Sequence, residues 1–168
     1  MFRGGANGMF SAGINTMAAE LEKRGISVHS QNWSAANSSL KAIKEAFAAD
    51  RQSGPVVIAG HSLGGSTAMR LANQLTAEGI PVDLVILFDP ISPSPVPKDV
   101  QKLINYRASS RADNRGDYKP GPGFKGKIVN LDIRTLPGLG RASHWNMVNQ
   151  PALQERVVQE IVGVVRQR

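Results

Sequence analysis

Cysteine is absent from the 168 residues of this chain, which excludes a disulfide framework, a thiolate nucleophile and a cysteine-ligated zinc site. Long apolar runs are absent too. The longest apolar stretches, such as Val56–Ala59 and Leu84–Phe88, are far shorter than the roughly 20 residues that span a bilayer. The segment Met1–Gly5 lacks the basic and apolar regions of a signal peptide. We therefore predict a cytoplasmic protein with no integral membrane association.

Motifs for metals, nucleotides and nucleic acids are also missing. The three histidines form no H-E-x-x-H sequence, and the glycine-rich hexapeptide 60–65 lacks the Lys-Ser/Thr ending of a phosphate-binding P-loop. Aromatic residues make up only 5% of the chain, and few of them lie near its most basic segment, 98–127, so nucleic-acid binding is not expected. We predict no metal site, no cofactor and no nucleic-acid partner.

The composition is that of one globular domain covering residues 1–168, with 41% apolar and 20% charged residues. The net charge is +7. Most of the excess positive charge lies in 98–127, which contains eight Lys and Arg residues and three Asp residues. The proline-rich segment 90–126 is predicted to be a substrate-side insert or loop, in which only 98–106 looks helical. Its basic residues either attract an anionic substrate or only keep the loop solvated.

Short runs rich in Val and Ile alternate with longer segments of helical periodicity. The runs predict strands at 26–29, 55–60, 82–88 and 127–133, and the periodic segments predict helices at 11–24, 37–51, 63–78 and from Pro151 onward. With a short amino-terminal strand, this alternation predicts an α/β fold: a minimal three-layer sandwich around a five-stranded, mainly parallel sheet. Ligands of such sheets bind beyond the carboxyl ends of the strands.

The most informative motif lies at one of these strand ends. The sequence Gly60-His-Ser-Leu-Gly64 fits G-x-S-x-G and stands between a predicted buried strand and a predicted helix. That context is typical of a nucleophile elbow, a sharp turn that exposes the serine hydroxyl. Ser62 is therefore the candidate nucleophile, and the Leu63 amide is a candidate oxyanion donor.

A serine nucleophile needs a base, and only three histidines are available. His144 lies after the last predicted strand and is favoured, although it could instead only pack the final helix. His61 is expected to point away from Ser62 within the elbow, and His29 is more typical of a polar strand end. The sequence predicts His144 as the general base.

The acid that orients the base is expected at another strand end. Asp89 follows the strand 82–88 and precedes Pro90, which fixes the turn; Asp132 is the alternative. The resulting order is Ser62, Asp89, His144, the serine, acid, histidine order of α/β hydrolases.

The stretches Val56–Gly65, Arg70–Leu75 and Val82–Pro90 resemble those of small lipase-like and thioesterase-like members of the α/β-hydrolase superfamily. The resemblance implies a serine esterase, lipase or thioesterase with a Ser-His-Asp catalytic triad, which cleaves a small-molecule carboxylic ester or thioester through an acyl-enzyme. The alternative is an inactive hydrolase-fold module that binds a partner through the basic segment 98–127.

Further site residues are expected in the loops near the nucleophile. Gly5 or Ala6, after the first short strand, is the candidate second oxyanion donor, unless these residues form only a glycine-rich turn. The remaining substrate-binding candidates are Asn7, His61, Trp33 and Trp145.

Overall fold

Strands and helices alternate along most of the chain. The computed structural model describes residues 1–5, 10–51, 54–108 and 116–167. The helices are α1 (Ala12–Lys23), α2 (Ala36–Ala49), α3 (Leu63–Ala77) and α4 (Pro151–Arg166). The strands are β1 (Phe2–Arg3), β2 (Gln31–Asn32), β3 (Val57–His61), β4 (Val82–Phe88), β5 (Val100–Arg107) and β6 (Lys127–Asp132). Short 3₁₀ helices lie at Trp33–Ala35, Ile133–Thr135 and Met147–Asn149.

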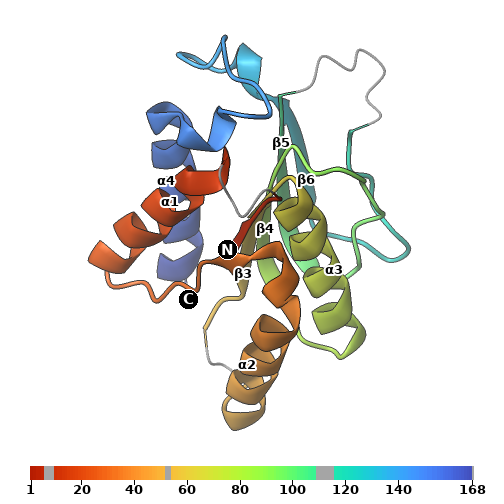
Figure 1. The fold of residues 1–168 in the computed structure, drawn as a ribbon. Helices are drawn as coiled ribbons and strands as arrows, with labels where there is room; N and C mark the ends of the chain where they lie inside the picture. The colour runs from red at the N-terminus through yellow and green to blue at the C-terminus, as the bar shows by residue number, and fades with distance from the viewer. Residues whose placement is uncertain (6–9, 52–53, 109–115, 168) are drawn as a thin grey trace.

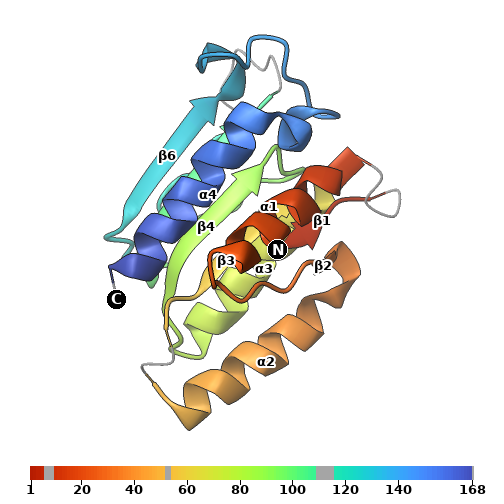
Figure 2. The same cartoon turned by 90° about the vertical axis from the view of Figure 1, so that its left-hand side faces the viewer.

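The six strands form one parallel sheet in the order β2-β1-β3-β4-β5-β6. Helices α1 and α4 cover one face of the sheet, and α2 and α3 lie on the other (Figure 1; Figure 2). The predicted α/β three-layer sandwich is confirmed, although the sheet has six strands and not five.

The additional strand is β5, which the sequence analysis missed. The prediction that 98–106 is helical is wrong, because Val100–Arg107 pairs with both β4 and β6. The apolar residues Val100, Leu103 and Ile104 have helical spacing, but a strand between two neighbours is buried on both faces and shows no simple alternation.

The segment 90–126 is therefore not one loop on the substrate side. The chain leaves the carboxyl end of β4 and reaches the opposite, amino end of the sheet, where β5 begins. Because β5 and β6 are parallel, β6 begins at that amino end too. Lys98 lies before β5, and Lys125 lies before β6. Both lysines belong to the end of the sheet opposite Ser62, which follows the carboxyl end of β3.

The second strand is also displaced from its predicted place. The prediction put it at 26–29, whereas only Gln31 and Asn32 pair with β1. Ile26 and Val28 still pack against the core beside α1, which explains their apolar character without sheet pairing.

Two apolar cores, one on each face, hold the sheet in place. From Leu84 to Phe88 the side chains of β4 alternate between them: Leu84, Ile86 and Phe88 pack toward α1 and α4, while Val85 and Leu87 pack toward α3, as does Val82 at the start of the strand. Each fully buried side chain of this kind contributes about 1.5–3 kcal/mol. The centre of the sheet is therefore a rigid support for the loops at its carboxyl end. Within the described part of the chain, the helices are too short or too polar to cross a bilayer.

Candidate active site

The turn between β3 and α3 has the backbone of a nucleophile elbow. Ser62 adopts φ 55° and ψ −121°, a left-handed conformation that is rare for residues other than glycine. A Cβ atom at Gly60 would lie 2.1 Å from the carbonyl oxygen of Gly64, and one at Gly64 would lie 2.4 Å from that of Phe2. Both motif glycines are thus required by close backbone contact, which lets the turn present the Ser62 hydroxyl.

The structure brings Ser62, His144 and Asp89 into one hydrogen-bonded row. His144 Nε2 lies 3.1 Å from Ser62 Oγ, and His144 Nδ1 lies 2.8 Å from Asp89 Oδ2. His144 is in the loop between β6 and α4, so these three residues come from separate parts of the chain that meet at the carboxyl end of the sheet.

The protonation of this row follows from its partners. Burial by itself raises the pKa of Asp89, but hydrogen bonds from His144 and from the Ala108 amide outweigh it and hold the pKa below its ordinary value. The ionised carboxylate accepts the Nδ1–H of His144. In the neutral imidazole, Nε2 is then the ring nitrogen without a hydrogen, and it can accept the proton of the Ser62 hydroxyl.

The two candidate acids have different partners. Asp89, like Ser62, is a non-glycine residue with positive φ, at 45°, and its amide donates to the Tyr106 carbonyl at 2.8 Å. Asp132 instead accepts two hydrogen bonds from the Arg134 guanidinium, at 2.9 and 2.6 Å. The hydrogen-bond partners therefore favour Asp89 as the residue that orients His144.

The loop after β1 lies against the elbow. A Cβ atom at Gly4 would lie 3.1 Å from Ser62 Cβ, and one at Gly5 would lie 3.1 Å from Leu63 Cδ1. The two described candidates for oxyanion donors, Leu63 and Gly5, are thus neighbours. Ala6 and Asn7 lie outside the described residues.

Besides Ser62 and His144, the described residues contain a second hydrogen-bonded serine–histidine pair, Ser11 and His61. Ser11 Oγ is 2.8 Å from His61 Nδ1, but Ser11 is only 1% exposed, so a substrate cannot reach its hydroxyl. The sequence analysis did not identify Ser11. Its position before α1 is that of an ordinary N-cap, yet its side chain makes no cap hydrogen bond and turns to His61. His61 contacts protein groups on both ring nitrogens, the Ser11 hydroxyl at Nδ1 and the His144 carbonyl at Nε2.

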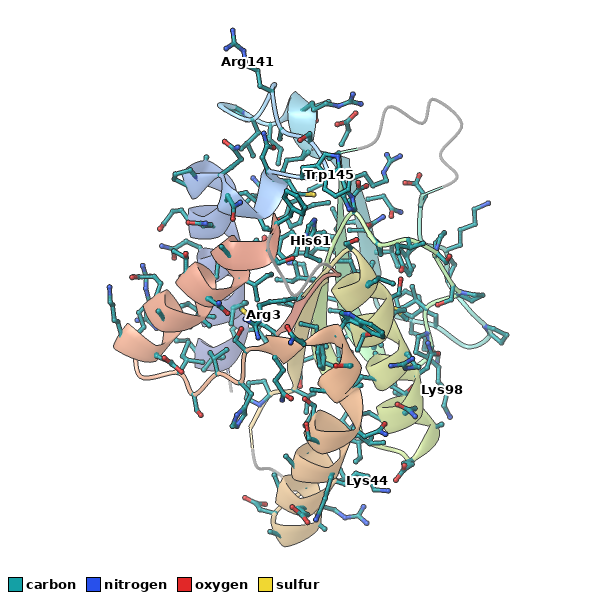
Figure 3. The ribbon with its side chains drawn as sticks, in the orientation of Figure 1. Arg3, Lys44, His61, Lys98, Arg141 and Trp145 are labelled. Carbon is teal, nitrogen blue, oxygen red and sulfur yellow. The ribbon has the colours of Figure 1, made fainter. Side chains whose placement is uncertain are left out.

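Large apolar side chains are exposed around the elbow. The described residues include four of them, and each follows the carboxyl end of a strand: Phe10, Trp33, Ile91 and Trp145. The Trp145 ring lies 5.0 Å from the ring of His144 and 4.9 Å from that of Phe10, which the sequence analysis missed. In Figure 3, Trp145 lies near His61, whereas Lys98 and Lys44 lie toward the other end of the molecule.

A cavity of about 560 Å³ lies elsewhere, at the amino end of the sheet. Its walls include His29, Phe47 and Val56, and none of Ser62, Asp89 or His144. His29 therefore lines this cavity and is not part of the row formed by Ser62, His144 and Asp89. Among the described residues, no group of three or more His, Asp or Glu side chains is arranged to hold a metal ion.

A comparison with protein families finds one matching model, described as a Thioesterase domain, over residues 11–108. The match covers more than half of the chain and includes Ser62 and Asp89, while His144 lies beyond it. A comparison with curated proteins finds no match.

Proposed function

The chain belongs to the thioesterase domain family, and from this premise we propose that it hydrolyses acyl thioesters with Ser62 as nucleophile, His144 as general base and Asp89 as the acid that orients the base. The observation that carries the proposal is the hydrogen-bonded row from Ser62 Oγ through His144 to Asp89, at 3.1 and 2.8 Å. These separations suit proton transfer between a nucleophile and its base.

In the first step the Ser62 oxygen attacks the thioester carbonyl carbon while its proton passes to His144 Nε2. The carbonyl oxygen becomes an oxyanion. Leu63 is the first residue of α3, so its amide has no acceptor within the helix. This amide and the positive end of the α3 dipole stabilise the developing charge, and the Gly5 amide is the proposed second donor.

The intermediate then collapses. The C–S bond breaks, the thiol leaves with the proton from His144, and the acyl group remains esterified to Ser62. In the second half a water molecule attacks this ester and gives its proton to His144 Nε2. The carboxylic acid leaves, and Ser62 recovers its proton from His144. The carboxylate of Asp89 stabilises the imidazolium each time it forms.

The exposed apolar side chains favour an acyl group with an apolar chain. Exposed apolar groups that cluster around a site are more often used for binding than isolated ones. Trp145 and Phe10 contact each other beside the ring of His144, and Ile91 follows Asp89 by two residues. An acyl chain bound on this surface would cover these apolar side chains while Ser62 attacks the thioester carbonyl carbon.

A fluorophosphonate probe tests the nucleophile. It forms a covalent bond with an activated serine oxygen and releases fluoride. We expect the wild-type protein to be labelled and Ser62→Ala to remain unlabelled. Ser66→Ala is the matched control, because Ser66 Oγ lies one turn further along α3, is buried, and has no hydrogen-bond partner among the described residues; this variant should be labelled like the wild type.

Rates with paired substrates test the reaction. We expect kcat/KM for an acyl thioester to exceed that for the nitrophenyl ester of the same acyl group. Faster cleavage of the ester would replace the thioesterase assignment with an esterase or lipase. A folded wild-type protein that resists the probe and cleaves neither substrate would favour the alternative, an inactive module that binds through 98–127.

A further inference from the structure

The imidazole of His61 is a buried polar group for which the proposed reaction has no direct use. The residue is 1% exposed and precedes Ser62 in the elbow. Its ring centroid lies 5.1 Å from that of His144. Burying an imidazole without hydrogen-bond partners costs about 1–3 kcal/mol. The hydrogen-bond partners of His61 therefore indicate which groups stabilise its buried position.

The partners of His61 define its tautomer. Nε2 lies 2.9 Å from the backbone carbonyl oxygen of His144, and a carbonyl can only accept, so Nε2 carries the hydrogen. Nδ1 of the neutral ring is then an acceptor, and the Ser11 hydroxyl donates to it at 2.8 Å. The Ser11 oxygen in turn accepts the amide hydrogen of Gly4 at 3.0 Å. Burial lowers the pKa of His61 to about 4, which keeps the ring in this neutral form near pH 7.

This chain of hydrogen bonds joins three segments of the proposed active site. Gly4 and Ser11 stand at the start and the end of the loop that contains Gly5, the proposed oxyanion donor. His144 carries the proposed base. His61 is covalently linked to Ser62. One imidazole ring therefore connects the proposed nucleophile with the backbone of His144 and, through Ser11, with that of Gly4.

We propose that His61 is a positioning residue, which fixes the backbone of His144 and, through Ser11, that of Gly4 relative to Ser62. It touches neither the Ser62 hydroxyl nor the substrate and acts through its two hydrogen bonds. The proposal rests on the proposed function. Misplacing a reacting group by about 1 Å can lower a rate about 100-fold, so loss of these bonds should lower kcat.

Three substitutions separate the two bonds. The amide nitrogen of His61→Gln can replace Nε2 as donor to His144, whereas the amide oxygen of His61→Asn can replace Nδ1 as acceptor from Ser11. His61→Phe keeps a ring and makes neither bond. We expect the Phe variant to lose about 100-fold in kcat, with KM within about threefold of wild type, since binding of the ground state is unchanged. The Gln variant should retain more activity than the Phe variant.

Two further variants separate positioning from fold stability. Thr76→Val removes a buried hydroxyl that donates to the Ala72 carbonyl at 2.9 Å, near the far end of α3. It should lower the melting temperature without changing kcat. Ser11→Ala should lower kcat about 10-fold, and adding it to His61→Phe should have almost no effect, because residues in one network are not additive.

All rates are to be divided by the concentration of sites that react with the fluorophosphonate, which counts only folded enzyme. The proposal is overturned if His61→Phe keeps kcat within twofold of wild type, or if the Gln variant is as slow as the Phe variant. If His61→Phe does not fold, Ser11→Ala decides alone: a lower kcat supports the proposal and an unchanged kcat overturns it. A wild-type protein that neither reacts with the probe nor cleaves a thioester would instead overturn the proposed function.

Discussion

The buried neutral ring of His61 should make the protein lose stability as the pH falls from 7 to 5. Burial lowers the pKa of this ring from 6.5 to about 4 in the folded protein. Below pH 6.5 the unfolded chain therefore binds a proton that the folded protein does not. The free energy of unfolding then decreases as the pH falls toward 4, and the contribution is fully present only above pH 6.5.

The size of the effect follows from the two pKa values. Since one pKa unit corresponds to about 1.4 kcal/mol, the full shift amounts to about 3 kcal/mol. Integrating proton binding between pH 7 and pH 5 gives a loss of about 2 kcal/mol from His61 alone. For a domain of this size, such a loss lowers the melting temperature by about 6 °C.

Urea unfolding at pH 7 and pH 5 measures this loss, with His61→Gln as the matched variant. Glutamine does not titrate but can still donate to the His144 carbonyl. Other titrating groups, including Asp89, are common to both proteins, so their contributions largely cancel in the comparison. We expect the wild type to lose about 2 kcal/mol more than the variant. Parallel losses in the two proteins would refute the conclusion that His61 is held neutral by burial.

Four further substitutions test other parts of the molecule. Asp89→Asn should lower kcat on a thioester by about 1,000-fold or more, and a loss below tenfold would show that another group orients the base. Gly64→Ala, whose Cβ would lie 2.4 Å from a backbone oxygen, should cost about 3 kcal/mol in thermal unfolding. Gly163→Ala, within α4, should gain about 1 kcal/mol, because among the described residues nothing outside the surrounding helix backbone would lie within 4 Å of the added Cβ. Trp145→Ala should raise KM more for a long-chain acyl thioester than for acetyl; equal changes would separate Trp145 from acyl binding.

The sequence predicts the fold well where local signals and tertiary pairing agree. Helix α3 begins directly after the elbow serine and ends before Gly79, and β4 is a continuous apolar run. The prediction from sequence fails at Val100–Arg107. The local spacing of apolar residues there favours a helix, but pairing with β4 and β6 makes the segment a strand.

The residues of the proposed site also differ in how well the sequence predicts them. Ser62 is identifiable because the turn itself requires glycines at fixed positions in the sequence. The partners of His61 are not, because Ser11 and His144 lie 50 and 83 residues away and no spacing rule relates them. Only the packing of α1 and of the loop before α4 on the sheet brings them together.

Among the described residues, the two non-glycine residues with positive φ are the proposed nucleophile and the proposed acid, and the sheet anchors both. The amide of Ser62 donates to the Phe88 carbonyl at 2.9 Å, and the amide of Asp89 donates to the Tyr106 carbonyl at 2.8 Å. Each bond continues the register of its strand pair, β3 with β4 and β4 with β5. Strain of about 1–3 kcal/mol at each residue persists only where the surrounding structure enforces it. The position of Ser62 relative to Asp89 therefore depends on the register of three central strands, and a change in that register would abolish this geometry even if both cores remained packed.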